Sequence, residues 1–179
     1  MIKISENIQL NAILESDTAS LFRLMSEIYP VAYSHLWTDY GAWYVNSQYS
    51  EENILKELLE EKADYYFILF NKEIVGNFRI LWDENLEGLS EEKQVKLHRL
   101  YLHQKIQGKG IGKKLVSWLE EKAKENNYQI IWLDAMNEQE QAFQFYEKLG
   151  YNYHSHTFLP FDLMHDWVRK MSQVYKLLT

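Results

Sequence analysis

The sequence predicts a single α/β (α+β) domain built on one mixed β-sheet with helices packed on its faces. Its 179 residues are 46% hydrophobic and 15% aromatic, which is enough apolar material for one core. No repeat, low-complexity segment or linker divides the chain, so we treat residues 1–179 as one domain. Consecutive β-prone runs are followed by alternating helix and strand patterns, an order that argues against a doubly wound sheet.

The first third of the chain predicts one strand and two helices. A short β-prone run covers 8–13, and apolar residues at helical spacing after a Ser-Asp cap predict a helix over 16–30 that ends at the proline. A segment dense in aromatic residues follows at 33–49. A second capped helix is predicted over 50–62.

The middle of the chain predicts three strands. Residues 65–70 and 74–82 are separated by a short polar turn and form a hairpin. An acidic loop over 83–92 leads to a strand at 95–102, which we place inside the sheet because both of its faces are partly apolar. Regular alternation predicts one face with Val95, Leu97 and Arg99 and an opposite face with Lys96, His98 and Leu100.

The last third predicts two helices and three extended segments. The strongest helical pattern covers 112–125, with charged residues on the face opposite its apolar stripe. A buried strand over 130–133 leads to a helix over 138–149 that ends at a glycine. Extended segments at 151–158 and 168–177 complete the chain.

Composition excludes several classes of function. A net charge of −7 argues against broad nucleic-acid binding, which needs clustered Lys and Arg. No run is long and apolar enough for a membrane helix or a secretory signal, so we expect a cytoplasmic protein with no membrane partner. With no cysteine, disulfides and a thiol nucleophile are excluded, and transfer through a thiol would need a cofactor's sulfur.

A glycine-rich run, Gln107-Gly108-Lys109-Gly110-Ile111-Gly112, joins the strand at 95–102 to the helix at 112–125. Three glycines in five positions let backbone N–H groups converge, and the following helix adds its positive end, so a pyrophosphate suits this loop. A glycine-rich turn with nothing bound is the alternative. No Lys-Ser/Thr pair follows, which excludes a Walker loop.

Two motifs in this order resemble the GNAT superfamily of acyltransferases. The run from Gln107 to Gly112 matches the signature Gln/Arg-x-x-Gly-x-Gly/Ala, and Gln139-x-x-Ala-x-x-Phe-Tyr-x-x-x-Gly-Tyr151 follows the family's second pattern. The departure is Gln139 where an Asn is usual, with Asn137 two residues earlier. The sequences at 100–102 and 145–150 are similar to those of the family branch that contains the bacterial polyamine acetyltransferases.

The resemblance implies a mostly antiparallel sheet of about six to seven strands flanked by helices on both faces, with acetyl-CoA as cosubstrate and no metal. Backbone groups at 100 and 102 would pair with the pantetheine arm, and those at 108–113 would hold the pyrophosphate. The cofactor-binding residues implied are Leu100, Tyr101, Leu102, Gln107, Gly108, Lys109, Gly110, Ile111, Gly112, Lys113, Tyr146 and one of the amides Asn137 and Gln139.

The same resemblance implies direct attack of an amine on the thioester, without a covalent enzyme intermediate. Tyr146 matches the family's proposed general acid. For the base we place His98 first, because it titrates near neutral pH, and Asp134 second, because a carboxyl would need burial to raise its pKa.

We expect the acetyl acceptor to be a small-molecule amine bound by Tyr33, Trp37, Asp39 and Trp43, through ring faces and a carboxylate. The alternative is that these aromatic residues only fill the core. A polyamine, an aminoglycoside and a protein N-terminus all stay open as acceptors, and we allow for a homodimer. His154 and His156 share one face of a strand, but no third ligand is evident, so we expect no metal.

Two other classes compete with the enzyme. One is a CoA-binding regulatory domain without catalysis, and the other is an interaction domain without a ligand. Tyr146 together with a base at His98 or Asp134 favours the enzyme.

Overall fold

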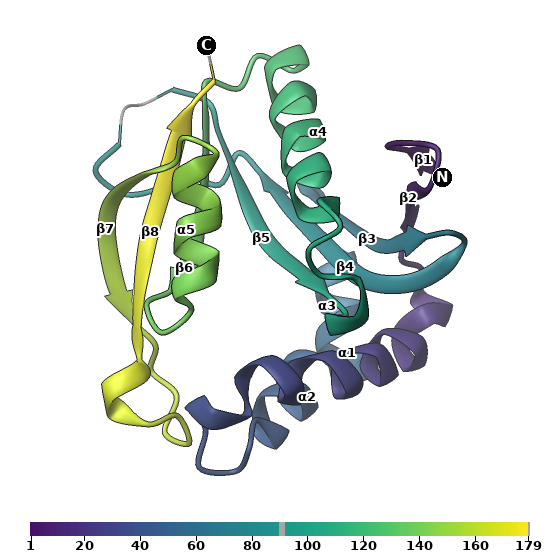
Figure 1. Ribbon diagram of the computed structural model, residues 1–179, viewed down its shortest axis with the longest axis vertical. Coiled ribbons are helices and arrows are strands. Elements are labelled where there is room, and N and C mark those ends of the chain that lie inside the picture. Colours follow the sequence, from purple (N-terminus) through teal and green to yellow (C-terminus); the bar gives the residue numbers. More distant parts are fainter. Residues whose placement is uncertain (90–91, 179) are drawn as a thin grey trace.

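The chain forms one sheet with helices on both faces, as seen in a computed structural model that describes residues 1–89 and 92–178 (Figure 1). The strands are β1 (Ile2–Lys3), β2 (Ile8–Ala12), β3 (Ala63–Phe70), β4 (Glu73–Trp82), β5 (Gln94–Leu102), β6 (Ile130–Met136), β7 (Asn152–Phe158) and β8 (Lys170–Leu177). The helices are α1 (Thr18–Tyr33), α2 (Ala42–Gln48), α3 (Glu51–Leu58), α4 (Ile111–Glu125) and α5 (Glu140–Lys148).

The sheet is mixed and mostly antiparallel, which confirms the predicted fold class. Its strand order is β1-β2-β3-β4-β5-β6-β8-β7. Only the β5–β6 pair is parallel in the part of the sheet that the structure describes. The sheet has eight strands rather than six to seven, because the chain begins with the two-residue strand β1 on β2.

Two hydrophobic cores lie on opposite faces of the sheet. One is formed with α4, whose Leu115, Val116 and Leu119 are fully buried against the strands, and with the inner side of α5. The other is formed with α1, α2 and α3 and is rich in aromatic residues. The strands therefore bury both faces, which explains their near-continuous apolar sequences.

Two predicted helix ends differ from the structure. Helix α1 continues through Pro30 to Tyr33, where Ser34 N–H still donates to the Pro30 carbonyl. A proline in the last turn removes one N–H, but the Tyr33 ring packs on Tyr29 at 4.8 Å and on Tyr101 at 6.0 Å between centroids, which offsets that loss. Helix α3 ends at Leu58, before the expected 62, because a tight turn leads directly into β3.

A gap opens in the middle of the sheet where β5 and β6 separate. Their pairing covers only Gln94–Lys96 with Ile130–Trp132, after which β5 stays with β4 and β6 stays with β8. Figure 1 shows the two strands diverging beyond this short contact. The later part of β5 therefore offers backbone groups that β6 does not pair.

A β-bulge at His98 reverses the faces of β5. The register with β4 shifts between Arg79 and Ile80, which leaves His98 as the extra residue. Leu97 and Leu100 consequently both belong to the core with α4, whereas Arg99 lies over the Tyr49 ring on the other side. The predicted alternation, which placed Leu97 and Arg99 on one face, is wrong for this reason.

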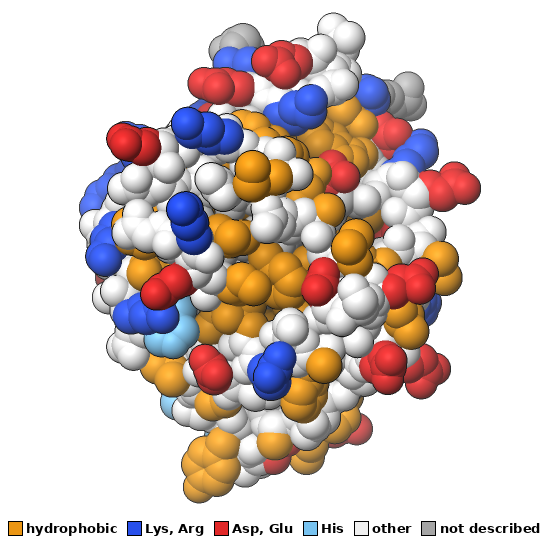
Figure 2. Space-filling model, turned by 90° about the vertical axis from the view of Figure 1, so that its right-hand side faces the viewer, with side chains coloured by type: hydrophobic (Ala, Val, Ile, Leu, Met, Phe, Trp, Pro, Cys, Tyr) orange, Lys and Arg blue, Asp and Glu red, His pale blue; other side chains and the backbone are white. Residues whose placement is uncertain are grey.

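The surface carries charges of both signs. On the face shown in Figure 2, Lys/Arg and Asp/Glu side chains are interspersed around apolar areas rather than gathered by sign. No described helix is long and apolar enough to cross a membrane. The predicted acidic loop at 83–92 includes residues 90 and 91, which lie outside the described residues.

Candidate active site

A cleft of about 480 Å³ lies where β5 leaves β6, between the start of α4, α5 and the end of α1. We call it the glycine-loop cleft. Its lining residues are Ile28, Ala32, Tyr33, Leu100, Tyr101, Leu102, Ile106, Gln107, Gly108, Gly110, Ile111, Gly112, Lys113, Gln139, Gln141, Ala142, Phe145 and Tyr146. Eleven of the thirteen predicted cofactor residues are among them, and Ile28 and Ala32 on α1 carry no sequence signal that we could have used.

The start of α4 presents free backbone N–H groups to this cleft. Gly110 is the N-cap with φ of +71°, and no side chain caps the helix there. Gly108 also has a positive φ of +76°, and a Cβ added at either glycine would meet no atom within 4 Å. Open space, unpaired amides and the positive end of a 15-residue helix together fit a diphosphate.

The two predicted lysines of this loop differ in position. Lys113 lines the cleft, whereas Lys109 is absent from its walls. The Lys109 Nζ lies 5.1 Å from the centre of the Phe70 ring. The Lys109 side chain therefore contacts the β3–β4 hairpin, and a role of residue 109 at the phosphates stays a prediction for its backbone N–H.

The structure separates the two amides that the sequence left open. Gln139 lines the cleft, and its Nε2 donates to the Ala32 carbonyl at 3.3 Å. The Asn137 Oδ1 accepts a hydrogen bond from Ser172 Oγ at 2.9 Å, away from the cleft. Gln139 is thus the amide placed to meet a ligand there.

Tyr146 projects from α5 into the same cleft. Its hydroxyl makes no hydrogen bond within residues 1–89 and 92–178. Burial, followed by the neighbouring Tyr33, raises its pKa. The hydroxyl therefore keeps its proton at neutral pH and can donate a hydrogen bond into the cleft.

A second cavity, of about 230 Å³, adjoins the first one. We call it the aromatic cavity, and it is lined by Tyr29, Tyr33, Leu36, Trp37, Tyr44, Gln48, His98, Arg99, Tyr101, Asp134, Met136, Leu159, Phe161, Met164 and Met171. Tyr33 and Tyr101 line both spaces. A group at the end of the glycine-loop cleft would therefore lie next to the contents of the aromatic cavity.

Two of the four predicted amine-binding residues line this cavity and two do not. Tyr33 and Trp37 belong to its wall. The Asp39 carboxylate instead accepts N–H bonds from Gly41 at 3.0 Å and Trp43 at 2.6 Å, so it holds the turn into α2. Trp43 packs on Trp37 from outside and is 39% exposed. Asp39 and Trp43 thus lie outside the wall of the aromatic cavity, and local backbone capping engages the Asp39 carboxylate.

Asp134 on β6 supplies the carboxylate of the aromatic cavity. Its Oδ2 lies 2.7 Å from Lys96 Nζ, and its Oδ1 accepts from Gln173 Nε2 at 3.3 Å. The side chain is 21% exposed, so the carboxylate is reached from the cavity while it is held in place.

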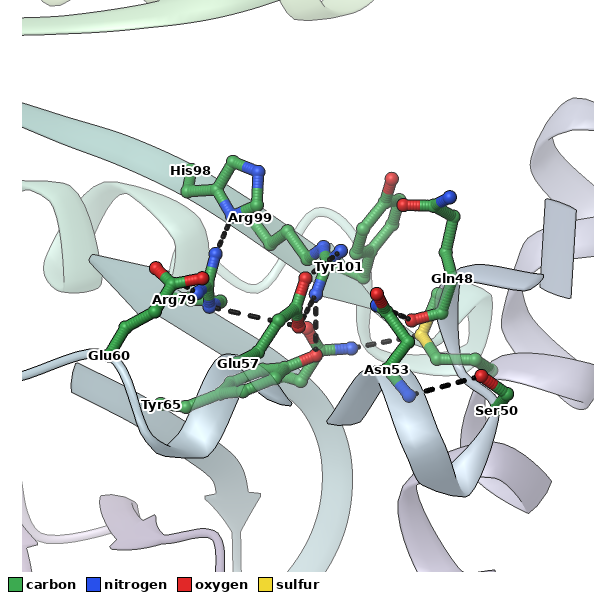
Figure 3. A network of polar contacts seen from close by, with 12 residues as sticks. Gln48, Ser50, Asn53, Glu57, Glu60, Tyr65, Arg79, His98, Arg99 and Tyr101 are labelled. Atoms are coloured by element: carbon green, nitrogen blue, oxygen red, sulfur yellow. Dashed lines mark hydrogen bonds and ion pairs between the residues drawn. The ribbon is translucent and has the colours of Figure 1, made fainter. Parts of the chain in front are cut away.

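His98 is bound to a buried arginine (Figure 3). Its Nδ1 lies 2.6 Å from Arg79 Nη1. Burial, followed by the positive charges of Arg99, Arg79 and Lys96, lowers the pKa of the imidazole to about 2. Such an imidazole takes up a proton only weakly, which argues against His98 as the general base.

Glu57 on α3 anchors the arginines around His98 (Figure 3). Its two oxygens accept from Arg99 Nη1 at 2.5 Å and Nη2 at 2.8 Å, and Arg79 Nε lies 3.8 Å from one of them. Glu60 accepts from Arg79 Nη2 at 2.8 Å. These pairs connect α3 to β4 and β5 beneath the aromatic cavity.

No group of three or more His, Asp or Glu side chains within residues 1–89 and 92–178 is placed to hold a metal ion. The His154 ring instead lies 2.9 Å from the Glu87 carbonyl, and His156 Nδ1 lies 2.8 Å from the Tyr153 hydroxyl.

Comparison with known proteins identifies the family of this chain. The model of the acetyltransferase (GNAT) family matches residues 19–151, and the chain belongs to this family. A curated relative from Lactobacillus delbrueckii subsp. lactis, named an uncharacterized N-acetyltransferase in the pepI 3′ region, is 25% identical over 109 residues. That match covers 61% of this chain and 63% of the relative.

Solved structures share the fold over nearly the whole chain. The PaiA N-acetyltransferase of Thermoplasma acidophilum in complex with coenzyme A aligns with a TM-score of 0.69 and 18% identity, covering 95% of this chain and 98% of that one. The spermidine N-acetyltransferase of Vibrio cholerae in complex with CoA and spermine aligns with a TM-score of 0.69 and 16% identity, covering 97% of each chain. At this level of identity the similarity establishes the fold.

Proposed function

We propose that the protein is an acetyl-CoA-dependent N-acetyltransferase that transfers the acetyl group to a primary amine of a small molecule by direct attack. One observation carries this proposal: two cavities meet at Tyr33 and Tyr101, one with free amides at the start of α4 and the other with aromatic rings and a carboxylate. Family membership supports the same reaction.

The residues of the glycine-loop cleft fit the cofactor in two ways. The amides at 108–113 would hold its diphosphate, and the unpaired backbone of β5 at 100–102 would bind its pantetheine arm as a neighbouring strand would. Gln139 and Tyr146 would contact the same arm from α5. When bound, acetyl-CoA supplies the thioester that the amine attacks.

Proton transfer is assigned to Tyr146 and Asp134. The Tyr146 hydroxyl, kept protonated by burial, would donate to the departing sulfur. Asp134 would accept the proton of the incoming ammonium, directly or through water, because its carboxylate opens into the aromatic cavity. Holding the amine beside the thioester supplies the rest of the rate enhancement.

The acetyl acceptor in this proposal is a small-molecule amine. A polyamine is the acceptor expected from the sequence. The structural similarity to the spermidine N-acetyltransferase of Vibrio cholerae supports testing polyamines among the amines. A CoA-binding domain without catalysis is the alternative function, and a free Tyr146 hydroxyl favours the enzyme over it. A cytoplasmic location and a homodimer stay predictions.

The test combines binding with turnover. Saturating CoA should raise the melting temperature of the purified protein, since a ligand that binds only the folded state stabilises it. An amine panel with acetyl-CoA should release free CoA thiol, and Tyr146→Phe should lower kcat at least about tenfold with little change in acetyl-CoA affinity. Stabilisation by CoA without thiol release for any amine would support the regulatory alternative. No effect of CoA on melting would refute the proposal.

A further inference from the structure

We propose that His98 is a specificity-determining hydrogen-bond donor, and that the aromatic cavity takes a primary monoamine whose aromatic body carries a hydrogen-bond-accepting oxygen. This inference rests on the proposed acetyl transfer and names its acceptor. It depends on the geometry of one hydrogen bond, on the position of the second ring nitrogen and on the charges around the cavity.

Arg79 fixes the tautomer of His98. A guanidinium group only donates hydrogen bonds, so at 2.6 Å from Arg79 Nη1 the His98 Nδ1 must be the acceptor. A proton on Nδ1 would point at the N–H of Arg79, and this clash of two donors would be costly because the Arg79 cation is buried, with 2% of its surface exposed. The neutral ring therefore carries its single proton on Nε2.

Nε2 is the nitrogen left for a ligand. Figure 3 shows it on the side of the ring that points away from Arg79. No other described residue is bonded to it, and it is not among the fully buried side-chain atoms without partners in the described part of the chain. The bulge turns both His98 and Arg99 toward the aromatic cavity, and Nε2 is the ring nitrogen left to donate to its contents.

The same geometry removes His98 as the base. Its lone pair on Nδ1 is aimed at Arg79 and not at the cavity, so it has no acceptor site for the proton of an incoming ammonium. Arg99 and Lys96, on the same strand, add positive charge beside the ring. The role left for His98 is to donate to an oxygen of the bound amine.

The charges around the cavity favour a single ammonium group. Asp134 is paired with Lys96, and Glu57 is paired with Arg99 and Arg79. The charged side chains in the cavity wall, as far as the structure describes it, are Asp134 and Arg99, whose formal charges cancel. A polyamine would bring further ammonium groups into this space without a matching carboxylate, at the cost of their hydration.

The remaining wall favours an aromatic body. Six rings face the cavity, those of Tyr29, Tyr33, Trp37, Tyr44, Tyr101 and Phe161. Stacked and edge-on packing against a flat ring satisfies such a wall, and one nearby ammonium can lie on a ring face. A sugar amine would bury many hydroxyl groups against these rings, which is unfavourable.

The experiment uses matched substrates. The 2-, 3- and 4-hydroxy isomers of 2-phenylethylamine are each compared with the methyl analogue of the same shape, and spermidine is the polycation. We expect at least one hydroxy isomer to exceed its methyl analogue in kcat/KM by about threefold to tenfold, the usual value of one hydrogen bond. Spermidine should have the lowest kcat/KM of the set. Preference for spermidine, or no preference for any hydroxy isomer, overturns the inference.

Variants of His98 test the donor itself. In His98→Leu the ratio of kcat/KM between a hydroxy isomer and its methyl analogue should fall to about one. His98→Gln should retain the preference, because the glutamine oxygen can accept from Arg79 and its NH₂ group can donate into the cavity. His156→Gln, on exposed strand β7 and outside both cavities, is the matched control. If His98→Leu does not fold, the His98→Gln enzyme still decides: a lost acidic limb in its pH–rate profile would restore the base role and refute ours.

The two proposals fail differently. If no amine in the set releases CoA thiol, the acetyltransferase function fails and this inference with it. If amines are acetylated but without dependence on the hydroxyl or on His98, only the inference fails.

Discussion

At the scale of single residues, neighbours decide what a titratable side chain can do. His98 and Asp134 line the same cavity and were both candidate bases. The imidazole lone pair is taken by Arg79, whereas the Asp134 carboxylate keeps a face open beside Lys96 and Gln173. Residue type alone favoured His98 as the base. Its hydrogen bond with Arg79, 19 positions away in the sequence, favours Asp134 instead.

The buried neutral state of His98 predicts acid sensitivity. Its pKa is lowered from an ordinary 6.5 to about 2, so below pH 6.5 the unfolded chain binds a proton that the folded chain does not. Stability is therefore lost as the pH falls below 6.5, by about 1.4 kcal/mol per unit for this one group.

Urea unfolding at pH 7.5, 6.5 and 5.5 checks this, with His98→Gln as the comparison. The other five histidines are common to both proteins, so their effects cancel in the difference. We expect the wild type to lose more stability than the variant on acidification. Parallel losses in the two proteins would contradict a neutral buried imidazole.

The structure brings some of the predicted site residues together in one cleft and leaves others outside it, for identifiable reasons. Two short motifs contain the glycines at 108–112, Gln139 and Tyr146, which all line the glycine-loop cleft. Each motif lies within one local element, so its spacing in the sequence determines how its residues are arranged in space. Asp39 was misread, because a carboxylate next to a turn has backbone N–H groups to cap. The sequence predicted Tyr101 only as a cofactor-binding residue. Its ring also lines the aromatic cavity because helix α1 crosses β5 there, which is a contact between segments distant in the sequence.

At the scale of elements, the start of α4 depends on a left-handed residue. In Gly110→Ala a Cβ at φ of +71° should cost about 1 kcal/mol of stability, and relaxation of that strain should turn the amides away from the diphosphate. We expect about a tenfold or greater loss of CoA affinity by calorimetry.

Gly150→Ala is the matched control for this substitution. Gly150 follows α5 with φ of +87°, and the nearest atom to an added Cβ is Lys176 Cε at 3.8 Å. Its stability should fall by a similar amount while CoA affinity is retained. Equal losses of affinity in both variants would show that general destabilisation, not the amide loop, controls binding.

Helix α3 is tied to the sheet by one carboxylate. Glu57 is 10% exposed and faces both Arg79 and Arg99, so Glu57→Gln should leave buried cations without a counter-charge and cost about 3 kcal/mol. Glu60 pairs with the same Arg79 but is 46% exposed, and Glu60→Gln should cost less than about 1 kcal/mol. Urea midpoints measure both, and similar costs would contradict this assignment.

Elements with strong periodicity were predicted and irregular ones were not. The apolar stripe of α4 and the runs of β3 and β4 gave nearly correct bounds. The bulge at His98 leaves no local signal, because an extra residue in β5 is defined by its register with β4. The extension of α1 beyond Pro30 likewise depends on ring packing between distant segments.

At the scale of the whole molecule, the two cores share one sheet. Ile68 belongs to the core with α4, and its neighbour Phe67 belongs to the core with α1–α3. Loss of either core would expose the strands of the other, so we expect a single unfolding transition. Tryptophan fluorescence and far-ultraviolet circular dichroism should give coincident urea curves. Two separated transitions would contradict the single-domain prediction.

The position of Tyr33 and Tyr101 between the two cavities also suggests a bisubstrate inhibitor for the proposed reaction. Because these two rings border both cavities, one molecule that tethers the CoA sulfur to an arylethylamine through a linker would occupy both at once. Such a bisubstrate compound loses translational freedom once instead of twice, and its second half binds at a high effective concentration. Its affinity should exceed that of either half, provided that the linker is long enough to pass around the packed rings of Tyr33 and Tyr101.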